Sequence, residues 1–191
     1  FLKTYYPHEF FAASMSMELS NQKKLSEFYE ELKRLGINII RPDINKCYAD
    51  FSSDGKNFFY ALGAIKSVGF EAISKIVEER SKNGSFKDLT DFINRVNPKY
   101  INKLQLEGLV KAGAFDNLYK NRHSLYNSIP NIILKSKNIF ENNSANQIDL
   151  FQEDNDETYL DIIEDWTVDV KLSKEFETLG FFISDHPLNQ Y

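Results

Sequence analysis

The five residues Lys66-Ser67-Val68-Gly69-Phe70 have the composition of a turn that binds phosphate. Apolar residues at helical spacing precede and follow them, so we predict two short helices joined at this turn. Gly69 would supply the positive φ that a tight turn between helices requires. The first N–H groups of the second helix would then point outward, where they can bind phosphate oxygens. Lys75 and Arg80 would add positive charge beside them.

A second glycine turn follows at 111–116. A helix rich in leucine precedes it, and another helix is predicted from about Asn121, with Pro130 straining its middle. The residues that would bind phosphate at this second turn are Lys111, Gly113, Ala114 and Arg122. The two units resemble tandem helix-hairpin-helix motifs, which grip the nucleic-acid backbone without reading its sequence. An ordinary helical hairpin with a glycine turn is the alternative.

The distribution of charge favours nucleic acid as the partner of the predicted hairpins. The chain has 191 residues and a net charge of −5. Residues 56–137 nevertheless carry 14 basic and 7 acidic side chains, whereas residues 138–191 carry 2 basic and 13 acidic ones. The positive surplus therefore falls on the segment that holds both glycine turns.

The remaining pattern predicts a mainly α fold with a small β-hairpin. Two helices are expected in residues 1–36, with Pro7 starting one and the other spanning Lys23–Leu35. A short strand at 37–40 and a β-hairpin at 51–60, turning at Asp54-Gly55, follow. Further helices are expected over 86–96, from the start signal Asn97-Pro98 to about Gly113, and over 172–179.

Residues 138–170 are polar and acidic, and they predict a flexible linker that leads to a closing segment at 171–191. Within the linker, an aliphatic and aromatic pair is suited to an apolar groove on a partner, with a nearby glutamine to set the register. This peptide comprises Gln147, Ile148, Asp149, Leu150 and Phe151. Incidental packing of Leu150 and Phe151 on the chain itself is the alternative.

Composition excludes several classes of protein. A single cysteine, Cys47, argues against disulfides and four-ligand zinc sites, and it favours the cytoplasm. The three histidines have no metal-binding spacing, so neither a metal nor a catalytic residue is predicted. No apolar run is long enough for a membrane span, so no membrane partner is expected. The chain begins at Phe1 and has the appearance of a piece of a longer protein.

Several blocks in the same order resemble the family-C DNA polymerases, the catalytic alpha subunits of bacterial DNA polymerase III. The matching stretches are 6–13, 62–69, 109–116, 121–122, 147–151 and 179–188. The resemblance implies that residues 1–60 end the fingers region and that residues 61–137 form a tandem helix-hairpin-helix domain holding duplex DNA. It also implies that 147–151 binds the sliding clamp, that 171–191 leads to an OB-fold missing here, and that the parent chain contacts other replicase subunits.

The chain departs from this family in two respects. Ser67 stands where helix-hairpin-helix motifs often have glycine. The family's catalytic carboxylates, which bind magnesium for nucleotidyl transfer, have no counterpart here, so this piece alone is expected to be inactive and to need no cofactor. The alternatives are the hairpin module of a repair enzyme (a ligase or an excision nuclease), the error-prone family-C polymerase, and a purely structural domain.

Overall fold

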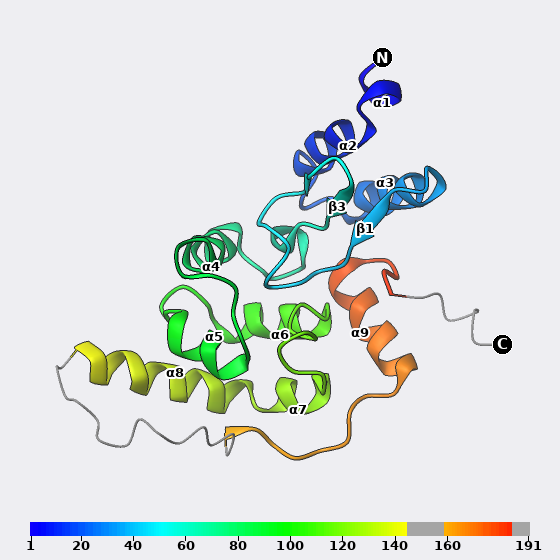
Figure 1. The fold of residues 1–191 in the computed structure, drawn as a ribbon. Helices are drawn as coiled ribbons and strands as arrows, with labels where there is room; N and C mark the ends of the chain where they lie inside the picture. Colours follow the sequence, from blue (N-terminus) through cyan, green and yellow to red (C-terminus); the bar gives the residue numbers. More distant parts are fainter. Residues whose placement is uncertain (145–158, 185–191) are drawn as a thin grey trace.

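The computed structural model describes residues 1–144 and 159–184, and this part of the chain is mainly α-helical with one small sheet. The helices are stacked from α1 (Leu2–Tyr5) and α2 (Pro7–Ser16) at one end to α7 (Arg122–Asn127) and α8 (Ile129–Ser144) at the other, and α9 (Val168–Leu179) runs alongside them (Figure 1). The predicted fold class, mainly α with a β-hairpin, is confirmed.

The first three helices are α1 (Leu2–Tyr5), α2 (Pro7–Ser16) and α3 (Gln22–Arg34). Pro7 starts α2, as predicted, because the missing N–H of proline has no intrahelical partner at that position. The Asn21 side chain caps α3 by accepting a hydrogen bond from the Lys24 amide at 3.2 Å. The buried side of α3 is formed by Leu25, Tyr29 and Leu32.

The sheet consists of β1 (Asn38–Ile40), β2 (Ser52–Ser53) and β3 (Asn57–Phe59), with β3 in the centre. The predicted hairpin is present as the antiparallel pair β2 and β3, with Gly55 at φ +84° in its turn. The predicted strand at 37–40 joins this hairpin as β1, which pairs in parallel with β3.

The first predicted hairpin contains one regular α-helix, not two. A single 3₁₀ turn, η1 (Leu62–Ala64), precedes α4 (Phe70–Asn83). The amides of Leu62 and Gly63 donate to the carbonyls of Tyr48 and Ala49, at 2.8 and 3.0 Å. An α-helix would continue only if the Lys66 amide bonded to the Leu62 carbonyl, but that amide donates to the Thr178 carbonyl at 3.0 Å, and Ile65 is already extended.

Helix α5 (Leu89–Arg95) is shorter than predicted, and α6 (Lys103–Lys111) begins later than the Asn97-Pro98 signal indicated. Asn97 caps only a turn, in which its side chain accepts from the Lys99 amide at 2.9 Å. Asn102 is the true N-cap, and it forms a reciprocal capping box with Gln105.

The predicted helix from Asn121 is two helices, α7 (Arg122–Asn127) and α8 (Ile129–Ser144). The prediction of a strained Pro130 was wrong, because Pro130 lies in the first turn of α8, where proline is tolerated. Helix α8 also continues to Ser144, so the linker predicted from residue 138 begins inside a helix.

Residues 159–184 form a segment that we call the strap, composed of an extended stretch followed by α9 (Val168–Leu179) and a short C-terminal turn. The acidic stretch to about residue 169 was expected to be solvated, yet Tyr159 and Leu160 are buried. The Asn121 side chain also donates to the Ile163 carbonyl at 2.7 Å. The strap therefore packs against the helices (Figure 1).

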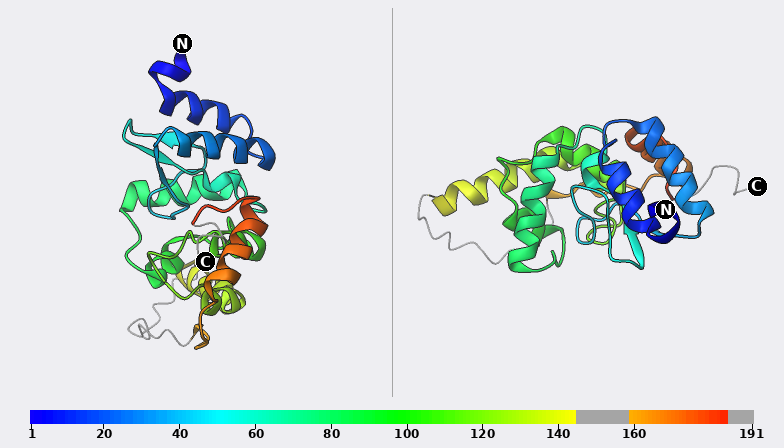
Figure 2. Two further views of the ribbon diagram at one scale, coloured as in Figure 1. Left: turned by 90° about the vertical axis from the view of Figure 1, so that its right-hand side faces the viewer. Right: turned by 90° about the horizontal axis from the view of Figure 1, so that it is seen from above.

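One continuous set of buried apolar residues extends from Phe11 to Ile183 through the described part of the chain. The strap reaches the N-terminal helices, where the Tyr29 hydroxyl donates to the Ile183 carbonyl at 3.1 Å. Two further views show α9 beside α3 and α6, and α1 projecting at one end (Figure 2). The domain borders at residues 60 and 137 stay predictions. No helix in the ranges described is long and apolar enough to cross a bilayer.

Candidate nucleic-acid interface

The first turn, residues 65–70, which we call the first corner, has an unusual backbone at Ser67 and not at Gly69. Ser67 has φ +67°, whereas Gly69 has φ −79°, so the predicted role of Gly69 was wrong. Glycine at position 69 instead allows close packing, because an added Cβ would lie 2.9 Å from Gln105 Nε2. The tight turn is made by a serine in the left-handed region, which is uncommon for residues other than glycine.

Three amides of the first corner remain free for an external acceptor. Two amides that were predicted to face phosphate are occupied, so for them the prediction was wrong: the Lys66 amide donates to the Thr178 carbonyl and the Val68 amide to the Ile65 carbonyl, both at 3.0 Å. The amides of Ser67, Gly69 and Phe70 have no acceptor among the described residues. They lie at the N-terminus of the 14-residue α4, where the helix dipole favours an anion.

Two predicted lysines lie exposed at or near this corner. Lys66 is exposed, and its amino group has no ion-pair partner in the described ranges. Lys75 lies on α4, pairs with Glu78 at 3.3 Å and lies over the ring of Tyr100, 5.8 Å from its centroid. Exposed pairs of this kind are weak, so both lysines remain able to approach a phosphate.

Arg80 does not belong to the exposed surface, contrary to prediction. Its side chain is buried and donates to the carbonyls of Ile44 and Cys47, at 2.7 and 2.6 Å. Its guanidinium group also lies 4.8 Å from the ring centroid of Tyr48. Arg80 therefore fixes the loop before β2 against α4 and is not available to a nucleic acid.

The second turn, residues 111–116, which we call the second corner, is closed by its own hydrogen bonds. Gly113 has φ +79°, as a tight turn requires. However, its amide donates to the Val110 carbonyl, and the Ala114 amide donates to the Leu109 carbonyl, both at 3.0 Å. Both residues are buried, so the prediction that these amides contact DNA was wrong.

Arg122 is also buried, at 7% exposure. It donates to both carboxylate oxygens of Asp116, at 2.9 and 2.7 Å, and to Glu175 of α9 at 3.1 Å. Burial alone would lower the pKa of Arg122, but the bonds to Asp116 and Glu175 raise it, so the group stays charged. Arg122 joins the second corner to the strap and, contrary to prediction, cannot also contact DNA.

Lys111 is the one member of the second predicted set that shares a surface with the first corner. A hollow of about 220 Å³ separates α6, the first corner and the end of α9. We call it the corner hollow, and its lining consists of Lys66, Ser67, Leu104, Glu107, Gly108, Lys111, Glu177 and Thr178. The two predicted sets of DNA-binding residues therefore contribute to one surface and do not form two separate binding sites.

Some residues that shape this surface had no place in the sequence-based prediction. Gly108 in the middle of α6 allows the close approach of the first corner, because an added Cβ would lie 2.9 Å from the Lys66 carbonyl oxygen. A glycine inside a helix is a signal for such packing. Thr178 and Glu177 come from α9, 66 residues or more beyond Lys111, and no local pattern connects them to the corner.

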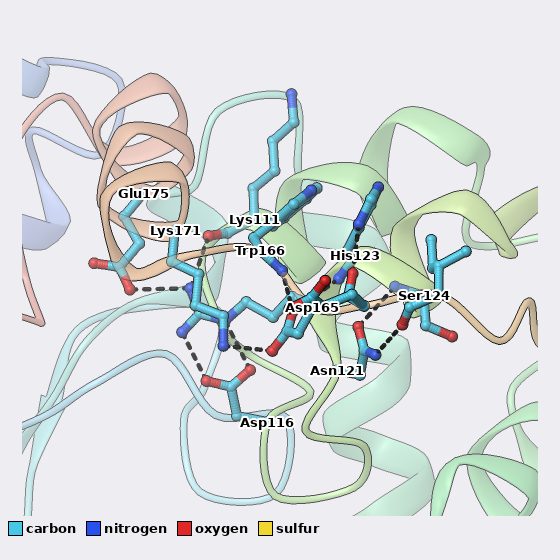
Figure 3. Close-up of polar contacts among 12 residues, drawn as sticks. Lys111, Asp116, Asn121, His123, Ser124, Asp165, Trp166, Lys171 and Glu175 are labelled. Carbon is cyan, nitrogen blue, oxygen red and sulfur yellow. Dashed lines mark hydrogen bonds and ion pairs between the residues drawn. The ribbon is translucent and has the colours of Figure 1, made fainter.

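The extended part of the strap is anchored on α7 (Figure 3). Asp165 accepts from the His123 amide at 3.2 Å and pairs with Lys171, while Trp166 stacks on the ring of His123. Burial would raise the pKa of Asp165, but hydrogen bonds from Lys171 and from the His123 and Trp166 amides together lower it. The strap is thus held by specific polar contacts as well as by apolar ones.

The predicted clamp-binding residues Gln147, Ile148, Asp149, Leu150 and Phe151 lie outside the described residues.

A family model described as "Helix-hairpin-helix motif" matches residues 36–125 of the chain. The match includes the first corner, α6 and the second corner. The motif that the two glycine turns indicated is therefore present.

Curated relatives match almost the whole chain. DNA polymerase III subunit alpha of Caulobacter vibrioides is 39% identical over 189 residues, which cover 98% of this chain and 16% of the relative. The proteins of the same name from Campylobacter jejuni and Escherichia coli K12 are 38% and 36% identical over 100% of this chain and 17% of each relative. The chain thus spans about a sixth of the length of these relatives. Along its length, therefore, it is homologous to one portion of the DNA polymerase III alpha-subunit family.

Proposed function

We propose that this chain is the part of a DNA-directed DNA polymerase that holds duplex DNA by its backbone, irrespective of base sequence. The observation that carries this proposal is the first corner, where the amides of Ser67, Gly69 and Phe70 and the amino group of Lys66 have no partner among residues 1–144 and 159–184. Such groups bind phosphate oxygens, and contacts of this type position a protein without specifying bases. A polymerase has to hold every sequence equally.

The magnesium ions that a polymerase needs would be held elsewhere in the parent chain. Within the described ranges, no group of three or more His, Cys, Asp or Glu side chains is placed to hold a metal ion. This chain's own contribution would be to hold and orient the duplex.

The corner is tested by reversing its charge. Lys66→Glu with Lys75→Glu should weaken duplex binding at least tenfold and reduce the slope of log affinity against log salt by about 2, at roughly 0.9 per phosphate contact. Fluorescence anisotropy with two duplexes of unrelated sequence, over a range of salt concentrations, measures both quantities. Lys56→Glu with Lys137→Glu is the matched control, because it makes the same change of charge at exposed positions away from the corner.

Equal losses in the two double variants would contradict the proposal, because they would show that only net charge matters. A strong preference for one of the two duplexes would also contradict it. A purely structural helical domain, the rival interpretation, predicts no loss in either variant.

We also propose that Gln147–Phe151 tethers the polymerase to the sliding clamp. Its support is the sequence: an amide side chain followed by an adjacent aliphatic and aromatic pair, in polar surroundings. A tether would complement a weak backbone grip by raising the local concentration of DNA. Leu150→Ala with Phe151→Ala should abolish capture by immobilised clamp and leave duplex affinity unchanged. Undiminished capture would refute this assignment.

A further inference from the structure

The corner hollow contains two carboxylates of the protein itself, Glu107, which pairs with Lys103 of α6 at 3.7 Å, and Glu177. Lys111 Nζ lies 3.1 Å from Glu177 Oε1, and both side chains line the hollow together with Lys66. Lys66 has no such partner in the part of the chain that the structure describes. The two lysines on one surface therefore differ in whether their charge is already compensated.

The two members of this ion pair differ in how firmly they are held. The Lys111 side chain is 14% exposed and lies over the ring of Tyr126, 5.6 Å from its centroid. Glu177 is 53% exposed, and it also pairs with Lys174 at 3.6 Å, one turn earlier on α9. A carboxylate so exposed can swing into solvent while Lys111 stays at the hollow, because an exposed ion pair is weak.

We propose that Glu177 competes with DNA phosphate for Lys111 and so weakens the grip of this surface on the duplex. The inference rests on the proposed function, since it concerns the same DNA-binding surface. When a phosphate enters the hollow beside Lys66, it can gain Lys111 only by displacing the Glu177 carboxylate. The pKa of Glu177 is lowered chiefly by its hydrogen bond from Lys111, in agreement with a carboxylate that stays ionised and competes near neutral pH. Weaker binding at this surface would favour sliding of the protein along the duplex.

The test is a double-variant cycle in the full-length protein with Glu177→Gln and Lys111→Gln. Glu177→Gln keeps the shape of the side chain and removes its charge, so duplex affinity should rise about two- to fivefold, the range expected for one exposed ion pair. The salt slope should steepen by about 0.9, because one more lysine would contact a phosphate. In the Lys111→Gln background, Glu177→Gln should give no such gain.

A matched control separates competition from general repulsion. Glu30→Gln removes a carboxylate of similar exposure that pairs with Lys33 on α3, so it should leave the duplex affinity unchanged within the error of the measurement. The inference is overturned if Glu177→Gln has no effect, or if its gain is the same with and without Lys111. If the unaltered protein does not bind duplex at all, the proposed function fails instead, and the two failures are thus distinguishable.

Discussion

At the scale of single residues, two corners that look alike in sequence have opposite roles. Three amides of the first corner have no acceptor in the described part of the chain, while the second corner uses its amides within its own turn. The arginines behave alike, since both Arg80 and Arg122 are buried and occupied by acceptors of the protein. Buried charges of this kind need internal partners, so they stabilise the frame that holds the corner.

Gly113→Ala tests how tightly the second corner is packed. Alanine at φ +79° is strained, and its Cβ would lie 2.3 Å from Arg122 Nη2, which ion pairs to Asp116 and Glu175 hold in place. We expect a loss of about 2–4 kcal/mol in the free energy of unfolding, from backbone strain plus overpacking. Gly55→Ala is the control, because Gly55 also has a positive φ but nothing within 4 Å of the added carbon, so about 1 kcal/mol is expected. Urea denaturation measures both, and equal losses would contradict the packing argument.

At the scale of elements, α9 connects regions that are distant in sequence. Glu175 accepts from Arg122 of α7 and from the Ser184 hydroxyl, and the Thr178 carbonyl accepts from the Lys66 amide. One turn of α9 therefore contacts both corners. The position of the first corner relative to α6 depends on this helix.

Glu175→Ala should lower the free energy of unfolding by about 2–4 kcal/mol, because it leaves Arg122 with only one of its two carboxylate partners in a buried site. Ser173→Ala, on the exposed side of the same helix, should change it by less than about 0.5 kcal/mol. Thermal and urea unfolding provide the comparison. A Glu175→Ala protein as stable as its control would show that this ion pair does not hold the strap.

The anchoring of the strap should also depend on acid. The pKa of Asp165 in the fold lies below its ordinary value of 3.8, so its stabilising contribution is present above 3.8 and is lost as pH falls below it. Trp166, the single tryptophan, reports on this contact through its stacking on His123. The free energy of unfolding should therefore fall less between about pH 5 and about pH 3 in the Asp165→Asn protein than in the unaltered protein. Asp169→Asn is the control, and its free energy of unfolding should fall as much as that of the unaltered protein. Identical pH profiles for the two variants would contradict this assignment.

At the scale of the whole molecule, the strap and the continuous core should make the described parts unfold together. Tyr29 in α3 bonds to the end of the strap, and Asn121 in α7 bonds to its beginning. We expect the urea transitions followed by Trp166 fluorescence and by far-UV circular dichroism to coincide. Two separated transitions would show that the N-terminal helices and the hairpins are independent units.

Much of the local structure could be predicted from the sequence, since it depends on neighbouring residues. Pro7 starts a helix, Asp54-Gly55 turns a hairpin, and a glycine turn at 111–116 ends α6. The predictions failed where distant segments decide. The first helix of the motif stops after one turn, because the Lys66 amide donates to the distant Thr178 carbonyl of α9. One failure was local instead, since the Asn97-Pro98 signal was outcompeted by the capping box of Asn102 and Gln105.

The sequence by itself determined the helix-hairpin-helix character of this protein, because glycine turns between apolar helical repeats and a local surplus of lysine are properties of neighbouring residues. Only the tertiary structure decided which groups remain available to a phosphate. The strap brings Thr178, Glu177 and Glu175 to the corners from far along the chain. Whether an amide or a guanidinium group is free depends on such distant partners, because most buried polar groups are hydrogen-bonded within the fold.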